Sequence, residues 1–125
     1  MDVHVSNSVT STCTIGMLRK TFCNFGLPDM LVSDNASNFV SQEMEDFLRK
    51  NGIKHVTPAP YNPSSNGLAE RGVRTFKEGL VRFKNGDVNT RICRFLYNYR
   101  RTVRSSTGKT PAEMMFNRNF RGTIE

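Results

Sequence analysis

Apolar residues recur every three or four positions in four stretches of the chain, which is the spacing of one face of an α-helix. The predicted helices begin near residues 11, 41, 68 and 88. Their apolar faces are, in chain order, Ile15, Leu18, Phe22 and Phe25; Met44, Phe47 and Leu48; Ala69, Val73, Phe76, Leu80 and Phe83; and Ile92, Phe95, Leu96 and Tyr99. A short fifth helix is predicted after Thr110, a favourable cap, with Pro111 as its first residue.

Three short apolar or alternating runs predict β-strands at residues 2–6, 30–33 and 53–57. In open α/β sheets, ligands gather at the carboxyl ends of the strands. The second predicted strand delivers Asp34 at such an end. This acid is therefore a candidate functional residue.

The composition indicates one small domain with an anionic partner. The chain has 125 residues, a net charge of +7 and a pI near 9.8. No long apolar segment or basic amphipathic helix points to lipid, so nucleic acid is favoured over a membrane. The start shows no signal peptide or presequence, and we expect an intracellular location, nuclear or cytoplasmic.

Cysteine and histidine usage gives no metal or disulfide signal. Three cysteines at unrelated spacings do not indicate a disulfide framework. Cys23 and Cys93 fall on apolar helix faces, where buried thiols are expected. His4 and His55 stand alone, so no zinc site is expected.

Two acids frame the stretch that carries the chemistry, residues 33–77. Asp34 stands in Ser-Asp-Asn-Ala-Ser-Asn-Phe (33–39), and Glu70 in Tyr-Asn-Pro-Ser-Ser-Asn-Gly-Leu-Ala-Glu-Arg (61–71). Carboxylates held on a strand end and a helix suit divalent metal ions. Each acid also has an ordinary interpretation: Asp34 as a turn former, and Glu70 as a first-turn glutamate favoured by the helix dipole.

The whole string resembles the catalytic core of retroviral and Gypsy-type LTR-retrotransposon integrases, whose last two catalytic acids have this spacing. The resemblance implies that Asp34 and Glu70 are catalytic and bind Mg²⁺ or Mn²⁺ in a two-metal site. It implies DNA as the partner and homo-multimers in the intact family. The DNA contacts that it implies are Asn35, Tyr61, Asn62, Ser65, Asn66, Arg74 and Lys77.

Some basic and loop residues keep a second interpretation. The loop at 61–67 also fits a mobile connector. Arg74 and Lys77 also fit a solvated helix face, in which Glu70 and Arg74 form a surface ion pair. For Arg100, Arg101 and Arg104, solubility and non-specific phosphate contact remain equally open.

The resemblance covers residues 1–125 as a partial integrase core domain, with its C-terminal helices at 88–118, and departs from the family in two places. Ala36 stands where the family usually has glycine, a mild change if this residue keeps a negative φ. The family's first two strands and its first catalytic Asp have no counterpart, and Asp2 does not match that Asp. The expected fold is therefore an α/β, ribonuclease H-like integrase core without its first two strands, with short remaining strands and about five helices.

The missing strands lead to expectations about stability and function. Helix faces such as that of Ile15, Leu18 and Phe22 would be exposed, so the chain would be of low stability and would aggregate or pair with another segment. The expected function is that of a retrotransposon-derived integrase domain, which binds nucleic acid and joins DNA ends to target DNA by metal-dependent phosphoryl transfer, impaired in this form. The alternative is a non-catalytic DNA-binding or protein-interaction remnant.

Overall fold

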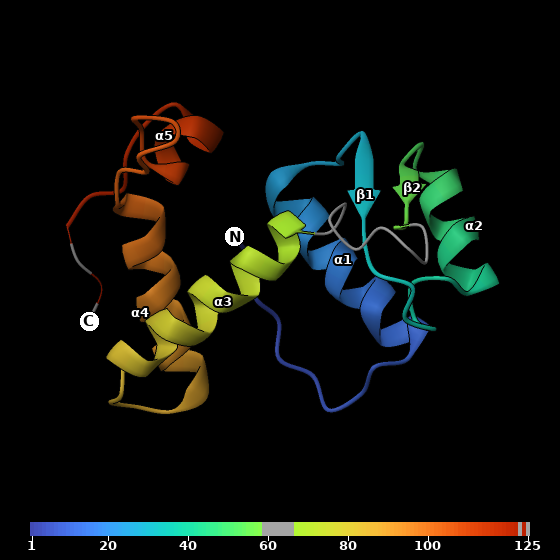
Figure 1. Cartoon of the computed structure of the whole chain (residues 1–125), viewed down its shortest axis with the longest axis horizontal. Coiled ribbons are helices and arrows are strands. Elements are labelled where there is room, and N and C mark those ends of the chain that lie inside the picture. Colours follow the sequence, from blue (N-terminus) through green and yellow to red (C-terminus); the bar gives the residue numbers. More distant parts are fainter. Residues whose placement is uncertain (59–66, 123, 125) are drawn as a thin grey trace. The chain divides into compact units, whose positions relative to one another are not determined.

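The computed structural model describes residues 1–58, 67–122 and 124 (Figure 1). The chain divides into two compact units. The strand-containing unit is His4–Arg71, and the helical unit consists of Met1–Val3 and Gly72–Glu125. No helix of the described residues is long and apolar enough to cross a membrane.

The strand-containing unit begins with α1 (Ser11–Phe25), and β1 (Met30–Val32), α2 (Gln42–Lys50) and β2 (Lys54–Val56) follow. The side chains of Thr10 and Ser41 cap α1 and α2 by accepting backbone hydrogen bonds. The two strands pair in parallel, which requires a crossover connection, and α2 provides it.

The core of this unit lies between its two helices and its strands. Ile15, Met44, Leu48 and Ile53 are buried, and partly buried apolar side chains pack around them: Leu18, Phe22, Leu31, Phe39 and Phe47. The expectation that the apolar face of α1 is exposed was therefore wrong. Helix α2 covers this face, and the rings of Phe22 and Phe47 stack with their centroids 6.3 Å apart.

The strand predicted at residues 2–6 was also wrong, because these residues form no strand in the structure. An alternating pattern becomes a strand only when a neighbouring strand pairs with it. Side-chain contacts hold this segment instead. Arg100 donates to the Met1 carbonyl at 2.7 Å, and Nε2 of His4 lies 2.7 Å from the Thr21 hydroxyl.

Strand β1 has one open edge among the described residues, because β2 is its single partner there. Met30 and Val32 point to the face opposite Leu31 and are 49% and 40% exposed. Open, apolar strand edges are sites where chains pair or aggregate. The expected aggregation or pairing stays a prediction, and this edge is where it would start.

The helical unit contains most of α3 (Gly67–Arg82), together with α4 (Val88–Arg101) and α5 (Pro111–Phe116). Its core is formed by Ile92, Phe95 and Leu96, with Met1, Val3, Phe76, Leu80, Phe83 and Tyr99 packed around them. The predicted buried face of α3 packs against this core only in its C-terminal half, where Phe76, Leu80 and Phe83 are half-buried. Ala69 and Val73 are exposed, because α4 packs against the later turns.

Gly79 of α3 packs against the ring of Phe95 on α4. A Cβ atom built at this position would lie 2.1 Å from Cε2 of Phe95, well inside van der Waals contact. Gly72 lies two helical turns before Gly79, and a Cβ atom built there would have only Cε of Met1 nearby, at 3.9 Å. Gly79 therefore has a packing reason, which Gly72 lacks.

The predicted burial of two cysteines was wrong, since Cys23 and Cys93 are both exposed. Each follows a residue that faces a core, Phe22 or Ile92, by one position. One position turns a helical side chain by about 100°, which carries both thiols away from the core.

Candidate active site

Asp34 lies one residue beyond β1, after Ser33, at the strand end where the sequence predicts it. The Ser33 amide donates to the Val56 carbonyl at 3.1 Å and so continues the strand pairing up to this acid. One carboxylate oxygen of Asp34 accepts the Ala36 amide at 3.0 Å, which is the turn geometry of the ordinary interpretation. The side chain is exposed, and no described residue bonds its second oxygen, which remains available to a ligand.

Residues beside Asp34 tie the ends of β1 and β2 together. The buried Ser33 hydroxyl donates to the Asp34 carbonyl at 2.9 Å and lies 2.7 Å from Nε2 of His55. The Asn35 amide donates to the Pro58 carbonyl at 3.1 Å. Asn35, an expected DNA contact, therefore uses one of its amide hydrogens within the fold.

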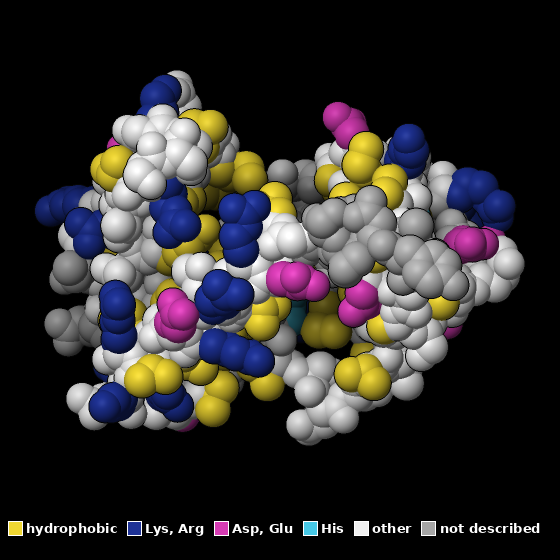
Figure 2. All heavy atoms as spheres, viewed as in Figure 1, with side chains coloured by type: hydrophobic (Ala, Val, Ile, Leu, Met, Phe, Trp, Pro, Cys, Tyr) yellow, Lys and Arg dark blue, Asp and Glu magenta, His cyan; other side chains and the backbone are white. Residues whose placement is uncertain are grey.

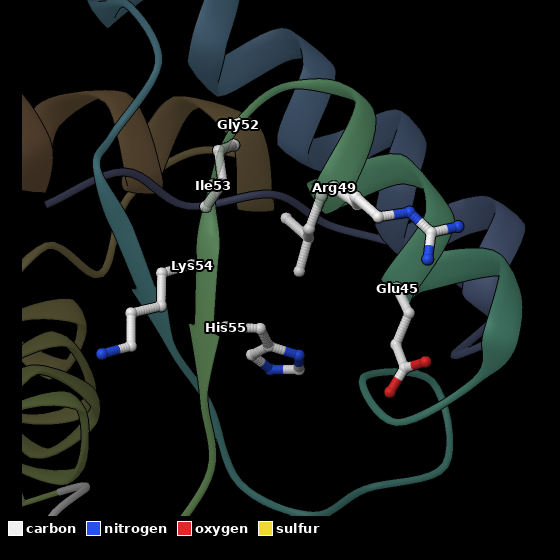
Figure 3. Close-up of a pocket in the computed structure, with 7 residues that line it drawn as sticks. Glu45, Arg49, Gly52, Ile53, Lys54 and His55 are labelled. Atoms are coloured by element: carbon white, nitrogen blue, oxygen red, sulfur yellow. The ribbon is translucent and has the colours of Figure 1, made fainter.

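The apolar and polar pattern of the sequence does not predict the pair of Ser33 and His55. The strand register accounts for the pair. It places His55 opposite Leu31, and Ser33, two residues after Leu31, points to the same face of the sheet. Figure 3 shows the His55 ring on the side of β2 that faces α2, while Lys54 points to the opposite side. The hollow of about 430 Å³ beside this ring has one acid, Glu45, and one base, Arg49, in its lining, and we assign it no ligand.

Helix α3 carries the second acid and two predicted DNA contacts. Glu70 lies in its first turn, and Arg74 and Lys77 follow at spacings of four and three, so the three share one helix face. All three side chains are exposed. Glu70 and Arg74 form no ion pair in the described part of the chain, so their charges are available to a ligand.

The structure thus forms two groups of predicted residues. Asp34 and Asn35 share the turn after β1, and Glu70, Arg74 and Lys77 share α3. The other predicted DNA contacts, Tyr61, Asn62, Ser65 and Asn66, lie outside the described residues.

The described residues offer the right type of ligand for a divalent metal ion, but too few of them lie together. Carboxylate oxygens are the ligands that Mg²⁺ prefers, and the two acids supply them. Among the described residues, however, no group of three His, Cys, Asp or Glu side chains could hold a metal ion. Asp34 and Glu70 would therefore supply only part of the ligands of such an ion.

The departure at Ala36 is as mild as expected. Asn117 is the one non-glycine residue with positive φ in the described part of the chain, so Ala36 keeps a negative φ. Alanine adopts such a conformation without strain.

Comparison with known proteins decides the family. The sequence pattern of the Integrase core domain family matches residues 1–63. The chain belongs to this family. An uncharacterized protein of Caenorhabditis elegans is 39% identical over 126 residues, which cover 98% of this chain and 10% of that protein. The Gag-Pro-Pol polyprotein of Simian retrovirus SRV-1 is 33% identical over 78 residues, 62% of this chain and 4% of the polyprotein.

Solved structures confirm the fold of this integrase core. A chain of the simian T-cell lymphotropic virus intasome matches with a TM-score of 0.82 at 25% identity, over 98% of this chain and 46% of that one. The HTLV-2 integrase catalytic core domain in complex with magnesium matches with a TM-score of 0.73 at 26% identity, over 86% and 71%. The predicted α/β, ribonuclease H-like integrase class and its retroviral or retrotransposon origin are confirmed. The integrase core spans a tenth or less of these two curated relatives.

Proposed function

We propose that this integrase core, of Gypsy-type retrotransposon origin, binds DNA and contributes Asp34 and Glu70 to a metal-dependent phosphoryl transfer that joins DNA ends to target DNA. The observation that carries the proposal is the placement of both acids. Each is exposed at the end of a regular element, one after β1 and one on the basic face of α3. The intasome and the magnesium-bound core among its structural relatives support the same chemistry.

The residues have distinct tasks in this proposal. Divalent ions held by carboxylates activate the attacking oxygen of water or of a DNA 3′ hydroxyl and stabilise the leaving oxygen. Asp34 and Glu70 contribute carboxylate ligands, while Arg74 and Lys77 bind phosphates and hold the DNA in place. Two acids are an incomplete ligand set, so the 125 residues alone would be impaired in the chemical step.

A second candidate function is a non-catalytic DNA-binding or protein-interaction module. The lack of a three-ligand group among the described residues favours it. Such a module would keep the exposed basic face of α3 and carry out no chemistry. Dimeric and trimeric forms are described for the HTLV-2 core, and we propose that this chain also self-associates.

Reversing the charge of Arg74 and Lys77 together is expected to weaken DNA binding by about tenfold or more at low salt. The loss of each phosphate contact also lowers the salt dependence of binding. The slope of the logarithm of the binding constant against the logarithm of the salt concentration should therefore fall by about two in magnitude. Fluorescence anisotropy with a labelled duplex measures both. Lys20→Glu with Lys50→Glu, on exposed positions of α1 and α2, makes the same change in net charge and serves as the control. Unchanged affinity after Arg74→Glu and Lys77→Glu would remove α3 from both candidate functions.

An assay of DNA nicking and strand transfer in the presence of Mn²⁺ distinguishes the catalytic integrase core from the non-catalytic module. We expect the chain, Asp34→Asn and Glu70→Gln to give the same background level of product, because two carboxylates alone hold the ions poorly. Activity that both substitutions abolish would show that the chain completes its ligand set with another acid. That result would reject the non-catalytic module.

A further inference from the structure

The excess positive charge of the chain is confined to one unit. The helical unit holds 12 of the 18 Lys and Arg residues and 5 of the 11 Asp and Glu residues, whereas the strand-containing unit holds six of each. The entire net charge of +7 therefore belongs to the helical unit. Figure 2 shows basic side chains gathered over α3 and α4 on the face in view. Arg74 and Lys77 account for only two of these 12.

Several of the other basic residues have structural tasks. Arg91 donates to the carbonyls of Leu80 and Phe83 at the end of α3, and Arg94 donates to that of Asn85. Arg100 bonds Met1 and Asp2. These three arginines are therefore used within the fold.

A group of arginines and aromatic rings lies where α4 meets the segment after α5. We call it the arginine–aromatic cluster, and it consists of Tyr97, Arg101, Phe116, Arg118, Phe120 and Arg121. Tyr97 and Phe120 stack with centroids 5.6 Å apart, and Phe116 and Phe120 stack at 5.8 Å. The Arg101 guanidinium lies 5.7 Å from the Tyr97 centroid, and that of Arg118 lies 5.9 Å from Phe120.

Two hydrogen bonds fix the backbone of this cluster. Nε of Arg101 donates to the Phe120 carbonyl at 3.1 Å, and the Tyr97 hydroxyl donates to the Arg121 carbonyl. They attach the segment around residues 120–121 to α4, although it has no regular structure of its own. The backbone of Arg121, which this segment carries, is thereby attached to α4.

The guanidinium groups of Arg101 and Arg118 lie within cation–π distance of a ring. Such a contact leaves N–H groups of the guanidinium fork able to bond an anion. That fork matches phosphate oxygens in a bidentate way. Arg118 and Arg121 are exposed, and neither they nor Arg101 forms an ion pair with a carboxylate of the described residues. The cluster thus presents exposed positive charge that an external anion would neutralise.

We propose that the arginine–aromatic cluster is a second nucleic-acid-binding surface, in which Arg118, Arg121 and the terminal nitrogens of Arg101 contact the phosphodiester backbone. Three guanidinium groups in one cluster suit a continuous backbone, since phosphates recur along it at regular intervals. This surface needs neither Asp34 and Glu70 nor the basic face of α3. It is therefore independent of the proposed function.

The test compares Arg118→Glu with Arg121→Glu against the Lys20→Glu, Lys50→Glu control of equal charge change. We expect the cluster variant to bind labelled nucleic acid about tenfold more weakly at low salt, with a smaller salt slope. A single strand and a duplex of the same sequence are the two probes, and a loss on either one supports the proposal and identifies the form that is bound. Affinity within about twofold of the control for both probes would overturn it.

Two further variants keep the result interpretable. Arg118→Gln with Arg121→Gln removes the charge without adding acid, and it should give a smaller loss of the same kind while the circular dichroism spectrum stays unchanged. A competition experiment tests whether phosphate is recognised: poly-glutamate and unlabelled DNA of equal total charge each compete with the probe for the unaltered chain. Equal displacement by the two competitors would overturn recognition of phosphate. If Arg74→Glu with Lys77→Glu weakens binding and the cluster variant does not, the cluster proposal fails and the proposed function stands; the reverse pattern rejects the role of α3 instead.

Discussion

Alanine at position 79 is expected to destabilise the helical unit by about 1–3 kcal/mol, although alanine is the better helix former. The new methyl group would stand 2.1 Å from Cε2 of Phe95. Phe95 is buried, and the rings of Phe76 and Tyr99 pack against it at centroid distances of 5.5 and 5.9 Å. The ring therefore has little space to turn away, and α3 must move from α4 or Phe95 must leave its rotamer.

Gly72→Ala is the matched control, because it makes the same change in the same helix without the clash. The nearest atom to its new methyl group is Cε of Met1 at 3.9 Å, an ordinary contact. Removal of a helical glycine then stabilises by up to about 1 kcal/mol. Urea unfolding followed by circular dichroism measures both variants, and amide exchange in α4 localises the effect. Equal stabilisation by both alanines would show that the two helices are not in close contact at Gly79.

The sequence predicts what short-range chemistry determines. Ser41 and Thr110 cap their helices because each accepts an amide only three residues ahead. The apolar face of α4 is confirmed for the same reason: a spacing of three and four residues needs no knowledge of the partner. Asp34 at a strand end and Glu70 in a first helical turn were likewise predicted from local pattern.

What the sequence does not predict depends on contacts between distant residues. The strand at 2–6 was wrong because alternation carries no information about whether a partner strand is present. Ile15 is buried because α2 packs against α1. The spacing of apolar residues within α1 does not reveal that partner. The bond between Ser33 and His55 and the approach of Gly79 to Phe95 join residues 22 and 16 positions apart. Such pairs become visible only once the strand register or the helix crossing is known.

Leu48→Ala is expected to cost the strand-containing unit about 2–5 kcal/mol, the range for truncating a fully buried leucine. Leu48 is 1% exposed in a small core whose other buried members are Ile15, Met44 and Ile53. The backbone carbonyl of Leu48 also accepts the Ile53 amide at 2.9 Å, where α2 leads into β2. A cavity there removes support from both strands.

The substitution should also destabilise the backbone beside the candidate site, since Asp34 follows β1 and this strand packs on the core. The amide of Ser33, bonded to Val56, should exchange faster in Leu48→Ala, and so should that of Lys54, bonded to Asp29. Leu27→Ala is the matched control, because the same truncation at a side chain that is 57% exposed should change stability by no more than about 0.5 kcal/mol. If both variants unfold at the same urea concentration, the packing of α1, α2 and the strands does not stabilise this unit. The position of Asp34 would then depend on the hydrogen bonds of Ser33 and Asn35 rather than on the core beneath β1.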